Sequence, residues 1–186
     1  MTLLELTVGL VVTGLVIAAG YAAFTTIIDR REGAAVANAE SAHAALLRGE
    51  LMRWLDGATP SIPQSITDPQ VTQELNLITR AETPMHTPTT GVRLFVDDGS
   101  DGYGTGLVAV LKPDVGTDSM RVLIDPDIRA MAVQYLVRVD GTPQWLSTES
   151  VQSQTPLAIR LSLAAYTPQL AAALAMPIEA PTGASR

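Results

Sequence analysis

The chain has 186 residues and a formal net charge of −7, and its 12 basic residues are scattered along its length. Scattered basic residues in an acidic chain argue against nucleic acid as a partner. The sequence contains no cysteine, which excludes a disulfide framework, a cysteine-ligated zinc site and a thiol nucleophile.

The first stretch, Met1 to Ile28, is apolar except for one carboxylate, Glu5. As a helix it would be about 40 Å long, which is enough to cross the roughly 30 Å hydrocarbon core of a bilayer. A cleaved secretory signal is a competing interpretation, although such signals begin with a basic segment and have a shorter apolar core. A plain membrane anchor is another. A charge deep in a bilayer costs about 2.5–3.5 kcal/mol on insertion scales, so Glu5 indicates a functional group that needs a partner charge.

A polar run at residues 29–32 follows and predicts a collar at the membrane surface. Apolar residues then recur at three- and four-residue steps, which predicts that the helix continues with one buried face. Gly57 and Pro60 are expected to end this helix, and Trp54 is expected in the core. The predicted buried stripe consists of Ala37, Ala44, Leu47, Leu51 and Leu55.

Residues 58–88 are rich in Pro, Thr, Ser and Gln, which predicts a meandering connection with one edge strand near 75–78. Alternating apolar residues, and a continuous apolar run at 107–111, then predict strands. Asp140-Gly141 predicts a hairpin turn that leads into a strand through Trp145. The Ala- and Pro-rich tail from about Pro168 is expected to fray. The predicted strands cover residues 92–96, 107–111, 120–124, 131–139 and 157–163.

The motif Thr2-Leu3-Leu4-Glu5-Leu6, followed by an apolar helix, resembles the mature N-terminus of type IV pilin-like proteins. In that family a short basic leader ending in glycine precedes a hydrophobic first residue, usually Phe, where Met1 stands here. The resemblance implies an α+β fold in which a long helix packs on antiparallel β-sheet. It divides the chain into a membrane-spanning and filament-core helix (1–28), an amphipathic continuation (29–56) and a periplasmic β-rich domain (57–186) packed with that continuation.

The same resemblance implies roles for residues at the N-terminus. Met1 would be the residue that prepilin peptidase exposes and N-methylates, and the Glu5 carboxylate would meet the amine of a neighbouring subunit and set the subunit register. At 4 Å and an effective dielectric of 20, such a pair gains about 4 kcal/mol, which is comparable to the cost of placing Glu5 in lipid. The residues implied in packing of the filament core are Leu3, Leu4, Leu6, Val8 and Leu10.

Two further segments resemble the J-type minor pseudopilin of type II secretion: LLRGELMRWLDGATP at 46–60, and VQYLVRVDGTPQWL at 133–146 with LAIRLSL at 157–163. This implies a non-catalytic subunit of a pseudopilus tip complex that supports export of folded proteins across the outer membrane. Its implied partners are the I-, K- and H-type minor pseudopilins, the major pseudopilin and prepilin peptidase. Its implied location is the bacterial inner membrane, crossed once, with the globular domain in the periplasm.

Several alternatives stay open. The chain is also compatible with a minor pilin of a type IV pilus or competence filament, or with a membrane-anchored periplasmic enzyme or ligand-binding module. Arg30 and Arg31 alone would place the C-terminal side in the cytoplasm, whereas the resemblance requires the opposite orientation, which a basic leader would set.

The sequence offers little catalytic chemistry. His43 and His86 are its two histidines, and both are expected in surface or packing roles because neither has the context of a catalytic triad. Asp97, Asp98 and Asp101 lie in a glycine-containing stretch and could supply oxygen ligands to calcium. The alternative is a solvated hairpin turn, which Asp and Gly favour on their own. No other cofactor is expected.

Overall fold

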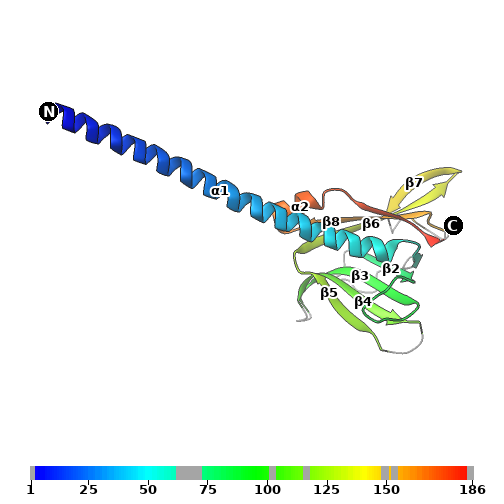
Figure 1. Ribbon diagram of the computed structural model, residues 1–186. Coiled ribbons are helices and arrows are strands. Elements are labelled where there is room, and N and C mark those ends of the chain that lie inside the picture. The colour runs from blue at the N-terminus through cyan, green and yellow to red at the C-terminus, as the bar shows by residue number, and fades with distance from the viewer. Residues whose placement is uncertain are drawn as a thin grey trace. The chain divides into compact units, whose positions relative to one another are not determined.

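One helix, α1, runs unbroken from Leu3 to Leu55 in the computed structural model of the protein (Figure 1). The structure describes residues 3–61, 73–100, 104–114, 118–147, 151 and 155–183, with side chains from Thr7 onward. Gly57, just after the helix, has a φ of 68°, a conformation that glycine adopts without steric cost. The predicted end of the helix is therefore confirmed, and Gly33 does not interrupt it.

The chain divides into two compact units, Met1–Glu40 and Ser41–Arg186. The second unit contains the last part of α1 and two antiparallel sheets. The five-stranded sheet has the order β1-β2-β3-β4-β5, and the four-stranded sheet has the order β7-β6-β8-β9. The strands are β1 (Thr59–Ser61), β2 (Glu74–Thr79), β3 (Thr90–Asp98), β4 (Thr105–Pro113), β5 (Met120–Asp125), β6 (Ile128–Val139), β7 (Thr142–Ser147), β8 (Ala158–Ala165) and β9 (Ile178–Pro181), and a short helix, α2 (Pro168–Ala173), lies between β8 and β9.

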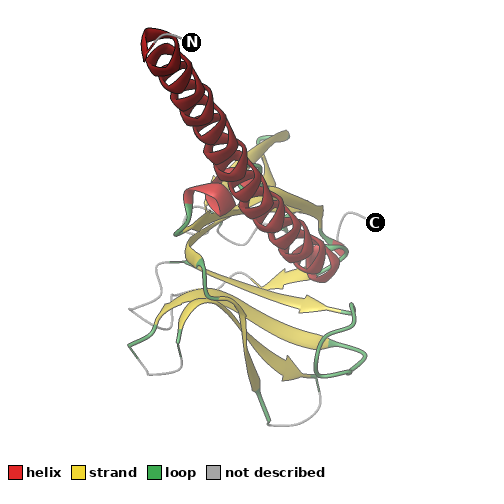
Figure 2. Ribbon diagram, turned by 60° about the vertical axis from the view of Figure 1, so that its left-hand side comes forward, coloured by secondary structure: helices red, strands yellow, loops and turns green. Residues whose placement is uncertain are grey.

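Both sheets and the last turns of α1 share one hydrophobic core. Figure 2 shows the two sheets as separate groups of strands beside the C-terminal end of α1. Trp54 is 2% exposed, as expected of a core residue. The predicted stripe is confirmed from Ala44 onward but is wrong at Ala37, which is exposed because it belongs to the first unit, outside this core. The buried stripe residues are Ala44, Leu47, Leu51 and Leu55.

The predicted hairpin joins β6 to β7. Asp140 and Gly141 both have positive φ, at 51° and 83°, as a two-residue turn matched to the twist of its strands requires. The pairing runs outward from Val139 opposite Thr142. Alternation along β6 places Val133, Tyr135 and Val137 in the core.

Two expectations are wrong. The strand near 75–78 is not an edge strand, because β1 forms directly after the helix and covers the free side of β2. The tail from Pro168 to Gly183 is not frayed: α2 buries Leu170, and β9 pairs with β8. Every residue from Leu170 to Ile178 is apolar, so the sequence did not indicate which of them are buried or how the tail packs. The buried apolar residues of the tail are Leu170, Leu174, Ile178 and Ala180.

The fold is thus α+β, with a long N-terminal helix packed against two antiparallel sheets through its last turns. This layout is compatible with a pilin-like architecture.

Candidate functional site: the exposed apolar helix

The N-terminal part of α1 carries a large apolar surface that is exposed among the described residues. Its large side chains are between 38% and 72% exposed. The segment is long and apolar enough to cross a membrane by length and composition, and none of its most apolar stretch is buried. An apolar surface of this size in water would favour association with lipid or with another protein. The exposed residues are Val8, Leu10, Val11, Val12, Leu15, Val16, Ile17, Tyr21, Phe24, Ile27 and Ile28.

Three threonine hydroxyls of this segment are satisfied within the helix. The Thr13 hydroxyl donates to the Gly9 carbonyl at 2.8 Å, and the Thr26 hydroxyl donates to the Ala22 carbonyl at 2.8 Å. Thr25 makes the same kind of bond to its preceding turn. A hydroxyl that is bonded to its own helix can be placed in lipid without losing a hydrogen bond to water. These three threonines are therefore compatible with an apolar environment.

Glu5 lies in α1 close to its N-terminal end. The unpaired backbone N–H groups at a helix N-terminus carry partial positive charge and stabilise a carboxylate there. Met1 lies outside the described residues, and so do the side chains of Leu3, Leu4, Glu5 and Leu6. Val8 and Leu10, the other two residues expected in filament packing, are 55% and 72% exposed and therefore accessible to a neighbouring helix.

The two acidic residues at the end of β3, Asp97 and Asp98, have partners within the protein. The Asp97 carboxylate accepts a hydrogen bond from the Gly99 N–H at 2.8 Å and forms an ion pair with Arg121. Asp98 accepts from the Ser100 N–H at 2.9 Å, and the backbone and side-chain hydrogen bonds from Ser100 lower the pKa of Asp98 below its usual value. Asp101 lies outside the described residues. Calcium binding by these three residues stays a prediction.

A cavity of about 240 Å³ lies between the C-terminal end of β3 and the start of β6. Its lining carries charged groups of both signs. In the part of the chain that the structure describes, no group of three or more His, Cys, Asp or Glu side chains is arranged to hold a metal ion. The lining residues are Gln73, Val96, Asp97, Asp98, Arg129, Ala130, Met131 and Tyr166.

The two histidines have different surroundings. His43 on α1 reaches the carboxylate of Asp125 at the end of β5, with 2.9 Å between Nε2 and Oδ2. The Asp125 side chain is 0% exposed, and its Oδ1 accepts a hydrogen bond from the Asp127 N–H. His86 lies 3.6 Å from Glu82, and both side chains are 77% exposed. His43 therefore joins the helix to the five-stranded sheet, whereas His86 lies at the surface.

We expect His43→Ala to destabilise the protein by about 1–3 kcal/mol, because the buried Asp125 carboxylate loses its side-chain partner. Urea unfolding in mild detergent, followed by tryptophan fluorescence, measures this change in the free energy of unfolding. His86→Asn is the matched control. Asparagine tolerates the positive φ at this position, and loss of an exposed pair should cost less than about 1 kcal/mol. Equal effects of the two substitutions would show that the His43–Asp125 contact does not stabilise the fold.

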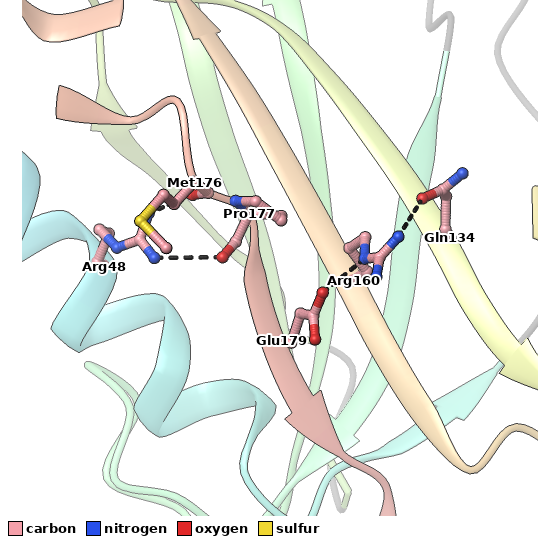
Figure 3. Close-up of polar contacts among 6 residues, drawn as sticks. All are labelled: Arg48, Gln134, Arg160, Met176, Pro177 and Glu179. Carbon is pink, nitrogen blue, oxygen red and sulfur yellow. Dashed lines mark hydrogen bonds and ion pairs between the residues drawn. The ribbon is translucent and has the colours of Figure 1, made fainter. Parts of the chain in front are cut away.

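The structure also brings together residues that sequence reasoning missed. The Arg48 guanidinium on α1 donates to the backbone carbonyls of Met176 and Pro177, just before β9 (Figure 3). Arg160 on β8 donates to Glu179 on β9 at 2.7 Å and lies over the Trp145 ring at 4.0 Å. Both arginines thus hold the C-terminal tail against the rest of the domain. The isolated charges inside apolar segments were the only signal in the sequence.

No model of a known protein family matches the chain, and no curated protein matches it closely enough to count as a relative.

Proposed function

We propose that the chain is a structural subunit of a pilin-like filament, and that it acts as a J-type minor pseudopilin of a type II secretion system. In this role it resides in the bacterial inner membrane, with its globular domain in the periplasm, and joins a tip complex with the I-, K- and H-type subunits and the major pseudopilin. It carries out no reaction of its own. Prepilin peptidase processes and methylates its N-terminus.

The observation that carries the proposal is the exposed apolar helix that continues without a break into the core of the β domain. An enzyme that needs only an anchor is usually joined to it by a polar, Gly- or Pro-rich linker. Here the helix that would enter the membrane also supplies Leu51 and Trp54 to the domain core. Its apolar surface needs lipid before assembly, and other helices of the same kind can replace that lipid in a filament.

Glu5 supports the assembly role more than simple anchoring. Anchoring would be improved by replacing a carboxylate near the end of a membrane helix with an apolar residue. A carboxylate that meets the free amine of the next subunit offsets its own cost and sets the axial position of one subunit against another.

The proposal is tested with Glu5→Ala and Glu5→Gln, expressed in a bacterium together with the secretion genes of its source. We expect both variants to enter the inner membrane normally. Their recovery in the sheared filament fraction should fall about tenfold or more, because an ion pair of about 4 kcal/mol is lost. Glu32→Ala is the matched control, since Glu32 lies on the same helix outside the apolar stretch and is exposed.

N-terminal mass spectrometry of the membrane-extracted protein provides an independent measurement. A methylated N-terminal residue is expected at the start of the mature chain. Normal filament recovery of Glu5→Ala, together with an unmethylated N-terminus, would contradict the proposal and favour a membrane-anchored enzyme or ligand-binding module.

A further inference from the structure

The cavity of about 240 Å³ beside the start of β6 is lined by residues from separate segments of the β domain. Asp98 is the last residue of β3, Arg129 is the second residue of β6, and Tyr166 directly follows β8. The Tyr166 N–H donates to the Asp127 carbonyl at 2.8 Å, which holds this segment against the start of β6. The cavity is smaller than the roughly 300–1,000 Å³ of pockets that take drug-sized ligands, so it suits a smaller molecule.

A β-bulge sets the position of Arg129. The pairing of β6 with β8 shifts its register between Ile128 and Ala130, and Arg129 is the extra residue. A bulge re-aims the side chain of its extra residue away from the alternation of a regular strand. Within the described ranges, the Arg129 guanidinium makes no hydrogen bond or ion pair. It is therefore free to bind a ligand carboxylate, which arginine contacts through two parallel N–H groups.

The two carboxylates at the cavity are not equivalent. Asp97 forms an ion pair with Arg121 and its side chain is 9% exposed, so its charge is compensated within the protein. Asp98 is exposed, and one of its oxygens accepts from the Ser100 N–H. The hydrogen bonds from Ser100 lower the pKa of Asp98, so this carboxylate is ionised at neutral pH. Asp98 is therefore the group that can receive a ligand ammonium.

The remaining lining supplies apolar contact and a further donor. Val96 and Met131 contribute apolar side chains to the wall. The Gln73 Oε1 accepts the Val133 N–H at 2.8 Å, which leaves the amide NH2 of Gln73 as its donor group. The cavity thus combines a cation, an anion and an apolar wall.

We propose that this cavity binds a free amino acid with an apolar side chain. The Arg129 guanidinium receives the ligand carboxylate, and the Asp98 carboxylate receives the ligand ammonium. Val96 and Met131 contact the ligand side chain. Arg129 and Asp98, both within the described residues, form no ion pair with each other, so each can meet the opposite charge of a zwitterion. A ligand with one charge leaves the other charge of the cavity without a partner, which disfavours it.

Equilibrium dialysis of the full-length protein in mild detergent against labelled L-leucine tests the proposal. We expect saturable binding of a single molecule per chain at millimolar concentrations or below. Isocaproate has the same skeleton without the ammonium group, and isoamylamine has it without the carboxylate. Each analogue should bind about tenfold more weakly or worse, because each loses one charge-assisted contact.

Substitutions of the two charged residues test the assigned roles. Arg129→Gln and Asp98→Asn should each raise the dissociation constant for L-leucine about tenfold or more. Arg138→Gln is the matched control for the first, since Arg138 is exposed on the same strand and does not line the cavity. Asp140→Asn is the control for the second, because asparagine tolerates the positive φ of this turn residue. Urea unfolding followed by tryptophan fluorescence checks that all four variants fold.

The proposal is overturned if L-leucine shows no saturable binding at millimolar concentrations, or if the cavity variants bind it as well as the controls do. Equal binding of isocaproate would overturn it in favour of a site for simple anions, and equal binding of isoamylamine in favour of a site for cations. None of the lining residues belongs to α1. Failure of this binding test therefore leaves the filament proposal intact, and loss of filament assembly in a Glu5 variant leaves amino-acid binding unchanged.

Discussion

A chain that ends at Thr167 should not form a folded β domain. The deletion removes α2 and β9, and with them the buried side chains of Leu170, Leu174 and Ile178. Loss of a single buried leucine side chain to alanine costs about 2–5 kcal/mol, against a total stability of about 5–15 kcal/mol for a typical domain. The deletion also leaves the β9 side of β8 without its partner strand. We expect protease-sensitive, aggregated protein and no cooperative urea transition by tryptophan fluorescence.

Point substitutions in the same tail should lower the free energy of unfolding by amounts that depend on how deeply the replaced side chain is buried. Leu170→Ala, at a side chain that is 0% exposed, should lower the free energy of unfolding by about 2–5 kcal/mol. Met176→Ala, at a side chain that is 74% exposed, should change it by less than about 0.5 kcal/mol, because Arg48 bonds to the backbone carbonyl and not to the side chain. A truncated chain that still unfolds cooperatively would show that the tail is dispensable.

Among substitutions of one charged residue, we expect Arg93→Ala to lower the free energy of unfolding the most. The Glu74 side chain is 1% exposed, and Arg93 contacts its Oε2 at 2.7 Å through two nitrogens. Asn76 donates to the other carboxylate oxygen at 2.9 Å. Removing one partner of a buried ion pair leaves an uncompensated charge and costs about 3–5 kcal/mol. Urea unfolding of the full-length protein in detergent measures the loss.

The matched control is Arg53→Ala, which removes an exposed ion pair with Glu50 on the helix surface. Its expected cost is below about 1 kcal/mol. Replacing both Glu74 and Arg93 with methionine should recover most of the stability lost in Arg93→Ala, because well-packed apolar residues can replace a buried ion pair at little cost. A small effect of Arg93→Ala, similar to that of Arg53→Ala, would contradict the role assigned to this pair.

The sequence identified the elements whose signals are local. Apolar residues without interruption indicated the membrane-compatible part of α1, and three- and four-residue spacing indicated the face that carries Leu47 and Leu51. Alternation indicated β3, β6 and β8, a continuous apolar run indicated β4, and Asp140-Gly141 indicated the turn between β6 and β7. Each of these patterns depends on neighbours within a few positions, because backbone geometry repeats every two residues in a strand and every 3.6 in a helix.

For the candidate site, too, the sequence indicated only the local features. Glu5 stands out because one carboxylate interrupts an apolar run, and this is a property of the sequence alone. Its role between subunits is a proposal about a second chain. The structure adds which residues of α1 belong to the hydrophobic core: they run from Ala44 to Leu55.

The tertiary structure alone decided which distant residues meet. Arg48 bonds to a carbonyl 128 positions away, and Arg93 pairs with a carboxylate 19 positions away on the neighbouring strand. It also packed the tail against the core, with β9 beside β8, and placed β5 at the edge of the other sheet. Sequence patterns indicate the face of a helix or strand on which a side chain lies. Which residue that side chain then contacts is decided by how the two sheets and the last turns of the helix pack around a common core.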